Sequence, residues 1–339
     1  MSKHLTLVAL ANTPISSQLN TALIAHAKVL GVEIAKDGNE QSHLKYFTAR
    51  WTCSQALLPE ARVAMRDIAA AHDADLAFLS PGFNPGEVKV LAMDMDSTLI
   101  NIECIDEIAD FTGKKAAVSE ITEATMRGEI KDFKESLRRR VALLEGVSAD
   151  VLESVYRERL RPNPGAAELL AGANAKGLYT LLVSGGFTFF TQKLQQELGF
   201  KQTQANTLEI IDGKLTGKVI GDIVDGAAKN AYLEQACALM NCKKGNSITM
   251  GDGSNDLPMM HGSGISIAYK AKPIVKEKAP THPPGPKIFV ENFSCFSTPP
   301  IRPSSRDPAT RWIPPPRKAP QTRQSAARQR HPEAPRTAP

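Results

Sequence analysis

The chain has 339 residues, of which 42% are hydrophobic and 23% charged, a composition typical of a soluble globular protein with about two domains. Its formal net charge of +5 is unevenly placed, since the 59 residues from Thr281 to Pro339 carry a net +7 and the first 280 a net −2. The basic character belongs to the end of the chain. A nucleic-acid-binding function of the whole protein therefore loses its main support.

Composition also argues against a membrane or secreted protein. No apolar run approaches the roughly 18 residues that a membrane span needs, and none near Met1 suits a secretory signal. The five cysteines are scattered and form no C-x-x-C pair, which argues against a zinc site and a disulfide framework. A reduced, cytoplasmic setting fits this cysteine usage best.

Residues 1–85 carry the pattern of a small α+β unit. Alternating or β-branched runs predict strands, and two amphipathic stretches predict helices, in the order β-α-β-β-α-β. The expected elements cover Leu5–Leu10, Ser16–Leu30, Gly31–Ile34, Lys45–Thr52, Pro59–Ala71 and Leu76–Leu79. No catalytic constellation occurs here, and Ser80–Glu87, with two prolines and two glycines, is the expected linker.

Residues 88–279 change to short apolar runs separated by long helical stretches, the pattern of an α/β domain. Runs bounded by Gly, Asp or Ser suit strands buried on both faces of a parallel sheet. Such runs are Val88–Met93, Tyr179–Val183, Ser247–Met250 and Ile265–Ala268. More than 80 residues separate the first two, so we expect a helical cap, at about 104–160, inserted after the first core strand.

Residues 281–339 contain 14 prolines among Arg, Gln and Ala. Such a segment buries too little apolar surface to offset its ordering entropy, so we expect a disordered tail.

The sharpest chemical signal is the pair Asp94 and Asp96, directly after the first core strand. The carboxyl ends of parallel strands are where open α/β sheets bind ligands. One carboxylate can attack an electrophile while the other handles a proton. A lone D-x-D is as often a simple turn, because turns favour Asp.

Three further segments strengthen this interpretation. Gly251-Asp252-Gly253-Ser254-Asn255-Asp256 also follows an apolar run, and its carboxylates suit a small hard cation. Ser184-Gly185-Gly186 ends a third run, where a hydroxyl and backbone amides can hold phosphoryl oxygens. Lys229 begins a helix-like stretch and can supply a cation for phosphate chemistry. Taken singly, these are ordinary turns and a solvated lysine.

Together the four segments resemble the haloacid dehalogenase-like superfamily in order and spacing, and within it the phosphoserine phosphatases, from about Val88 to Ala279. The resemblance implies a Rossmann-like parallel sheet with a helical cap and a Mg²⁺-dependent hydrolysis of O-phospho-L-serine, the last step of serine biosynthesis (EC 3.1.3.3). Residues 1–85 more weakly resemble ACT-like regulatory domains, which implies a possible homodimer.

The resemblance also implies roles for individual residues. Asp94 would be the nucleophile that forms an aspartyl-phosphate, and Asp96 the general acid and base. Mg²⁺ would be held by the Asp94 carboxylate, the Asp96 carbonyl and Asp252, with Asp256 in support. The phosphoryl oxygens would be bound by Ser184, Gly185 and Lys229, with Asn255 nearby.

In the cap, the resemblance assigns substrate selection to two charged residues. Glu103 would meet the ammonium group and Arg140 the carboxylate, to which a planar guanidinium is well suited. Met126 and Phe133 match apolar positions that close over the substrate, although both suit an ordinary core equally well. The alternative for the run Arg138–Arg140, given less weight, is a solvated helix face.

Other functions remain open at this point. The same fold can act on another small phosphate ester or transfer the phosphoryl group to another hydroxyl, which a comparison with homoserine as acceptor would reveal. An inactive amino-acid sensor is opposed by the presence of all the acidic and basic motif residues. A nucleic-acid contact by the Arg/Pro-rich tail lacks interleaved aromatic residues.

The resemblance breaks off near Pro280, where the family continues with another strand and a closing helix. We expect both to be lost here, as after a change of reading frame, although Lys287–Val290 is briefly strand-like. Losing them would leave apolar surface unburied at about 25 cal/mol per Å². Every candidate site residue precedes the break.

Overall fold

The computed structural model describes residues 5–271 except 12, 43–46, 56, 80–82, 127–128 and 131, and the backbone of a strand at 287–290. The expected linker lies partly outside these residues, and the expected disordered tail does so apart from that strand. Among the helices in these ranges, none is long and apolar enough to span a membrane.

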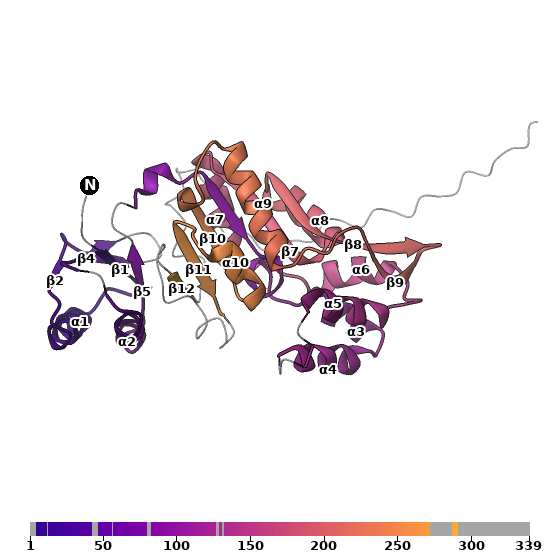
Figure 1. Cartoon of the computed structure of the whole chain (residues 1–339), viewed down its shortest axis with the longest axis horizontal. Helices are drawn as coiled ribbons and strands as arrows, with labels where there is room; N and C mark the ends of the chain where they lie inside the picture. Colours follow the sequence, from indigo (N-terminus) through magenta and orange to yellow (C-terminus); the bar gives the residue numbers. More distant parts are fainter. Residues whose placement is uncertain are drawn as a thin grey trace, which may run out of the picture. The chain divides into compact units, whose positions relative to one another are not determined.

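The N-terminal unit has the expected β-α-β-β-α-β order, with one short strand added (Figure 1). Its sheet is antiparallel throughout, in the order β2-β4-β1-β5, and β3 pairs with β4. The elements are β1 (Leu5–Ala11), α1 (Ser17–Val29), β2 (Ile34–Lys36), β3 (Gln41–Ser42), β4 (Phe47–Cys53), α2 (Pro59–Ala70) and β5 (Ala74–Leu79).

The N-terminal core lies between one face of this sheet and both helices. Alternate residues of β1, from Leu5 to Ala11, are buried against α1, which presents Leu19, Leu23 and Ala27 at helical spacing. The Ser16 side chain begins α1 by accepting from the Leu19 amide at 3.1 Å. The second strand starts at Ile34 instead of Gly31, because Gly31 adopts φ 68° in the turn that follows α1.

The second unit contains the expected alternation of strands and helices, with the cap helices between β6 and α7 (Figure 1). Its first half comprises η1 (Pro85–Glu87), β6 (Val90–Met93), η2 (Met95–Leu99), α3 (Cys104–Phe111), α4 (Lys115–Met126), α5 (Phe133–Ala142), α6 (Asp150–Ser154), η3 (Val155–Arg159) and α7 (Ala166–Ala175). Its second half comprises β7 (Tyr179–Phe187), α8 (Thr188–Leu198), β8 (Gln202–Ile211), β9 (Lys214–Ile220), α9 (Gly226–Leu239), η4 (Lys244–Asn246), β10 (Ser247–Gly251), η5 (Ser254–Asp256), α10 (Leu257–Met260), β11 (Ile265–Tyr269) and β12 (Lys287–Val290).

The large sheet has the order β12-β11-β10-β6-β7-β8-β9 and is parallel except for the β8–β9 pair. The chain passes from β6 to β7 on one side and later from β10 to β11 on the other. The strand order therefore reverses between β6 and β10, which is where an open α/β sheet forms a crevice at its carboxyl edge.

Both faces of this sheet are covered, so its central strands are apolar throughout. In β6, Leu91 and Met93 pack in the cluster that contains α7 and α8, whereas Val90 and Ala92 pack against α9. Continuous burial of this kind is the reason that the parallel strands were recognisable as short apolar runs.

Two parts of the fold differ from expectation. Neither α8 nor the β8–β9 hairpin was predicted from the sequence; in the hairpin, polar and apolar residues are mixed and most are not fully buried. The expected loss of a terminal strand is wrong, because the backbone of Lys287–Val290 pairs with β11 as a parallel edge strand. The expected loss of a closing helix lies outside the described residues.

Asn163 joins the chain that leaves the cap helices to the chain that enters them after η2. Its buried amide donates to the carbonyls of Thr98 at 2.8 Å and Ile100 at 3.1 Å. Asn163→Ala leaves two buried acceptors unpaired, so we expect the free energy of unfolding to fall by about 1–3 kcal/mol, measured by denaturant titration. The exposed Asn39→Ala is the control; equal stability of the two variants would contradict this prediction.

Candidate active site

Asp94 directly follows β6 and is 5% exposed. Its side chain accepts from the Met95 amide at 2.7 Å and so begins the turn η2. Within this turn Ser97 adopts φ 56°, a left-handed conformation that is uncommon for a residue other than glycine. The turn contains Asp96, and the chain after it leads into α3, the first helix of the cap.

Lys229 is fully buried in the first turns of α9 and joins two carboxylates. Its Nζ lies 2.8 Å from Asp94 Oδ1 and 2.7 Å from Asp256 Oδ1. Burial opposes the charged form of the lysine, but Asp256 and Asp94 outweigh it and raise the pKa of Lys229. The ammonium is therefore fixed beside the candidate nucleophile.

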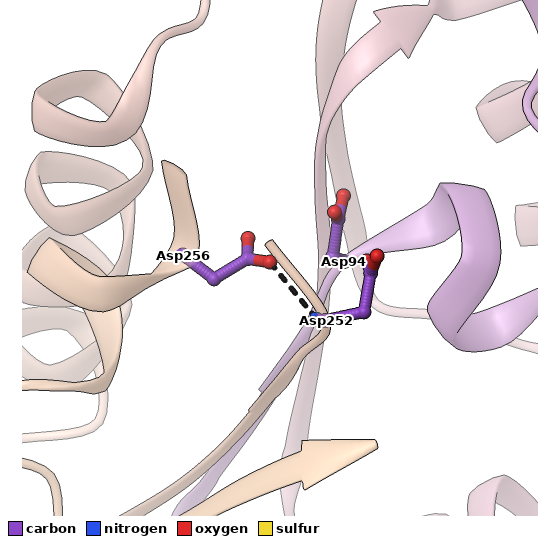
Figure 2. A group of neighbouring side chains, drawn as sticks. All are labelled: Asp94, Asp252 and Asp256. Atoms are coloured by element: carbon purple, nitrogen blue, oxygen red, sulfur yellow. Dashed lines mark hydrogen bonds between the residues drawn. The ribbon is translucent and has the colours of Figure 1, made fainter. Parts of the chain in front are cut away.

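Asp252 and Asp256 lie on the loop after β10. Asp256 Oδ2 accepts from the amides of Asp252 at 3.1 Å and Gly253 at 3.0 Å, and the first of these bonds is drawn in Figure 2. Gly251 permits this closure, since a Cβ there would lie 2.4 Å from Asp256 Cγ. Asp252 accepts from the Thr98 hydroxyl at 3.2 Å, which links the loop to η2.

The three carboxylates of Asp94, Asp252 and Asp256 fit a small divalent cation. Each offers an oxygen within 4.8 Å of the others, and all three residues are buried (Figure 2). Burial and then Asp256 raise the pKa of Asp94 well above its usual range, although Lys229 opposes this. Three carboxylates facing one ammonium leave an excess of negative charge that a hard cation with oxygen ligands would offset.

Asp96 lies next to these groups, in an environment suited to proton transfer. Burial, followed by the charge of Glu103, raises its pKa to about 7, while the Cys104 amide donates to Oδ1 at 3.4 Å. A carboxyl group that titrates near neutrality can both give and take a proton.

The residues at the end of β7 lie close to Asp96 and to Phe133 of the cap. The Ser184 hydroxyl accepts from the Gly186 amide at 2.8 Å. A Cβ on Gly186 would lie 2.8 Å from Asp96 Oδ2, and one on Gly185 would lie 2.9 Å from Phe133 Cζ. The two glycines thus let this backbone approach the Asp96 carboxylate and the Phe133 ring of α5, and a larger residue would displace those side chains.

Glu103 and Arg140 approach the same region from the cap. Ser97 donates to Glu103 Oε1 at 2.7 Å, so the left-handed turn residue holds this carboxylate. Burial lowers the pKa of Arg140, against the opposing charges of Glu103, Asp106 and Asp96. The two groups of opposite charge therefore lie within electrostatic range of each other and of Asp96.

Two further candidate residues, Asn255 and Met126, lie in η5 and at the end of α4. Asn255 lies on the β10–α10 loop with Oδ1 2.3 Å from where a Cβ on Gly253 would be, so it packs over that glycine. The side chain of Met126 lies outside the described residues.

Sequence reasoning missed two polar residues that hold the site together. Thr98 bonds to Asp252, as described above. Asn206 in β8 donates to the Gly185 carbonyl at 2.8 Å and accepts from the Val224 amide at 2.8 Å. Thr98 stands within the motif after Asp94 and could have been considered, whereas Asn206 lies in a strand that the pattern did not reveal.

Comparisons with known proteins agree with this geometry. The sequence profile of haloacid dehalogenase-like hydrolases matches residues 91–261. A phosphoserine phosphatase from a Polaromonas species is 55% identical over 204 residues, covering 59% of this chain and 86% of the relative. The crystal structure of a probable phosphoserine phosphatase from Vibrio cholerae superposes with a TM-score of 0.63 at 33% identity and covers 80% of each chain.

A structure described as a phospho-aspartyl intermediate analogue of phosphoserine phosphatase superposes with a TM-score of 0.53 at 38% identity, covering 56% of this chain and 90% of the other. The chain belongs to the haloacid dehalogenase-like hydrolase family. Within that family, the Polaromonas relative is named a phosphoserine phosphatase and the Vibrio cholerae structure a probable one.

The carboxylate cluster predicts that a divalent cation stabilises the folded chain. Saturating Mg²⁺ should raise the thermal midpoint of the metal-free protein by about 5–10 °C, because binding to the native state alone adds about 2.7 kcal/mol at a hundredfold excess over Kd. Asp252→Asn should lose more than half of this rise.

The exposed Asp222→Asn is the matched control and should keep the full rise. Differential scanning calorimetry measures both variants against the wild type. A rise that survives in Asp252→Asn would place the cation elsewhere.

Proposed function

We propose that this chain is a Mg²⁺-dependent phosphoserine phosphatase that hydrolyses O-phospho-L-serine to L-serine and phosphate. One observation carries the choice of substrate: a carboxylate and a guanidinium of the cap, Glu103 and Arg140, both lie within electrostatic range of Asp96. An amino acid presents the complementary pair of charges. The close similarity to phosphoserine phosphatases supports the same assignment.

In the first half-reaction, an Asp94 carboxylate oxygen attacks phosphorus and the bond from phosphorus to the serine oxygen breaks. Asp96, in its protonated form, gives its proton to the departing serine oxygen. Its pKa of about 7 leaves a substantial protonated fraction at neutral pH. The products are an aspartyl-phosphate on Asp94 and free L-serine.

In the second half-reaction, Asp96 is a carboxylate and removes a proton from water as the water oxygen attacks phosphorus. The bond from phosphorus to the Asp94 oxygen breaks, which releases phosphate and restores the Asp94 carboxylate. Asp96 ends protonated and ready for the next substrate. Only one proton-transfer group is needed, because the two steps use it in opposite directions.

The phosphoryl oxygens would be bound by the Ser184 hydroxyl, the Gly185 amide and the Lys229 ammonium, with Asn255 at the edge. Phosphoryl transfer asks mainly for alignment and charge stabilisation, and a fixed ammonium beside Asp94 supplies both. Asn206 supports the end of β7 by donating a hydrogen bond to the Gly185 carbonyl.

Mg²⁺ would be held by the Asp94 carboxylate, the Asp96 carbonyl and Asp252, and when bound it would neutralise charge on the phosphoryl group. Asp256 would act indirectly, because its carboxylate is already engaged by Lys229 and by two backbone amides.

Three further expectations from the sequence stay predictions: a cytoplasmic location, a homodimer formed through an ACT-like N-terminal unit, and the separation of the chain into domains at 1–85 and 88–279. Light scattering of the full chain would decide the second.

The mechanism predicts that Asp94→Asn abolishes turnover. We expect phosphate release from O-phospho-L-serine to fall at least about a thousandfold, because an amide cannot form the aspartyl-phosphate. Release should also stop when a chelator removes the metal. A malachite-green phosphate assay measures both.

Asp222→Asn is the control for expression and charge and should retain wild-type rates. Phosphate release by Asp94→Asn at more than a few per cent of the wild-type rate would contradict Asp94 as the nucleophile.

The substrate assignment predicts a selective effect of Arg140→Ala. We expect kcat/KM for O-phospho-L-serine to fall about ten- to hundredfold, because a charge-assisted bond to the substrate carboxylate is lost. Hydrolysis of p-nitrophenyl phosphate, which has no carboxylate, should change less than about threefold.

Arg138→Ala is the matched control, since Arg138 is exposed on the same helix. Equal losses on both substrates in Arg140→Ala would show that this residue supports the fold or the phosphoryl site and does not select an amino acid.

A further inference from the structure

The C-terminal end of α9 has a defined backbone geometry. Asn241 adopts φ 50°, the Cys242 amide donates to the Cys237 carbonyl at 2.9 Å, and the Asn241 amide donates to the Ala238 carbonyl at 3.0 Å. These paired bonds, from the sixth residue to the first and from the fifth to the second, define a Schellman motif. The chain therefore folds back on the last turn of the helix.

A Schellman motif commonly brings the first and sixth side chains into apolar contact. Here both positions are cysteine. Cys237 is 3% exposed and Cys242 is half-buried, and both belong to the cluster under β6 and β7. Burial, and next the neighbouring Cys242 thiol to which it is hydrogen-bonded, raise the pKa of Cys237 to about 12. The two thiols are thus adjacent, with one of them accessible from solvent.

We propose that Cys237 and Cys242 form a reversible disulfide, an oxidation site separate from the phosphatase centre. A peroxide is the oxidant. The Cys242 thiolate attacks the peroxide O–O bond, which gives a sulfenic acid and hydroxide, and the hydroxide becomes water with the proton that the Cys242 thiol had lost. The Cys237 thiol then attacks that sulfur and its proton leaves with the displaced hydroxide as water, so that two thiols lose two electrons and hydrogen peroxide becomes two waters. A dithiol reductant restores both thiols.

The cysteine pair lies away from the candidate active site but on the elements that position Lys229 and Asp252. Cys237 lies two turns along α9 from Lys229, and Cys242 precedes η4 and β10, which ends next to Asp252. The intervening Lys244 donates to the Pro258 carbonyl at 3.0 Å and to Asn230. The disulfide would fasten the outer end of α9 to the turn that leads into β10.

The other described cysteines do not offer the same arrangement. Cys53 is buried in β4 and Cys104 is buried at the start of α3, and all four described cysteines are free thiols. A preference for oxidation at Cys237 and Cys242 would therefore reflect the motif and not cysteine content.

Peptide mapping of the full chain tests the proposal directly. Trypsin cleavage after Lys229 and Lys243 releases Asn230–Lys243, which contains both cysteines and no other. After mild hydrogen peroxide treatment of the native protein and alkylation, we expect this peptide to be two hydrogen atoms lighter and to carry no alkyl group. After dithiothreitol it should carry two, while Cys53 and Cys104 remain alkylated throughout.

Three comparisons keep the proposal falsifiable. Wild-type protein in guanidinium should form this bond at least tenfold more slowly, because the motif is lost. Asn241→Gly, which keeps the left-handed residue, should react within twofold of wild type, and Cys242→Ser should give no such peptide. A peptide whose two thiols stay alkylated while Cys53 or Cys104 oxidises, or one that reacts equally fast unfolded, would overturn the assignment.

Discussion

The ion pairs of Lys229 with Asp94 and Asp256 are the interaction on which the rest of the site depends. Burying three carboxylates in one region is costly, and a single ammonium bonded to two of them makes the arrangement tolerable. The remaining oxygen of Asp256 is satisfied by two backbone amides. The same lysine therefore holds the loop after β10 and orients the candidate nucleophile after β6, and in the proposed mechanism it provides a cation for phosphate.

The sheet topology explains why these groups meet. Asp94 and Asp252 follow neighbouring parallel strands at the point where strand order reverses, so the loops that carry them lie side by side at the carboxyl edge of the sheet. Lys229 enters from the first turns of α9, which packs on β6 and on its other neighbour, β7. The residues are far apart in sequence, but each needs only to end a strand or begin a helix to arrive at this edge.

Because the candidate site residues lie at the ends of strands or the start of a helix, several of them could be predicted from the sequence. Asp94, Ser184 and Asp252 each follow an apolar run, so a local pattern located them and the central strands together. Asn206 and the β8–β9 hairpin escaped notice because their stability comes from contacts with residues that are distant in sequence, such as the Gly185 carbonyl. The edge strand at Lys287–Val290 was judged lost because the family resemblance had ended, yet a parallel edge needs only a few residues with free backbone groups.

The turn η2 links the proposed catalytic carboxylates to Glu103, the proposed partner of the substrate ammonium, in a single short segment. It begins with the Asp94 side chain accepting from the Met95 amide, and its left-handed Ser97 donates to Glu103. The charge of Glu103 in turn raises the pKa of Asp96 in the same turn. A substrate ammonium placed beside Glu103 would offset that charge and lower the pKa of Asp96, so occupancy of the proposed amino-acid subsite would change the proton affinity of the proposed general acid and base. In the proposed mechanism, recognition of the amino acid and proton transfer at its hydroxyl are thereby linked through one carboxylate.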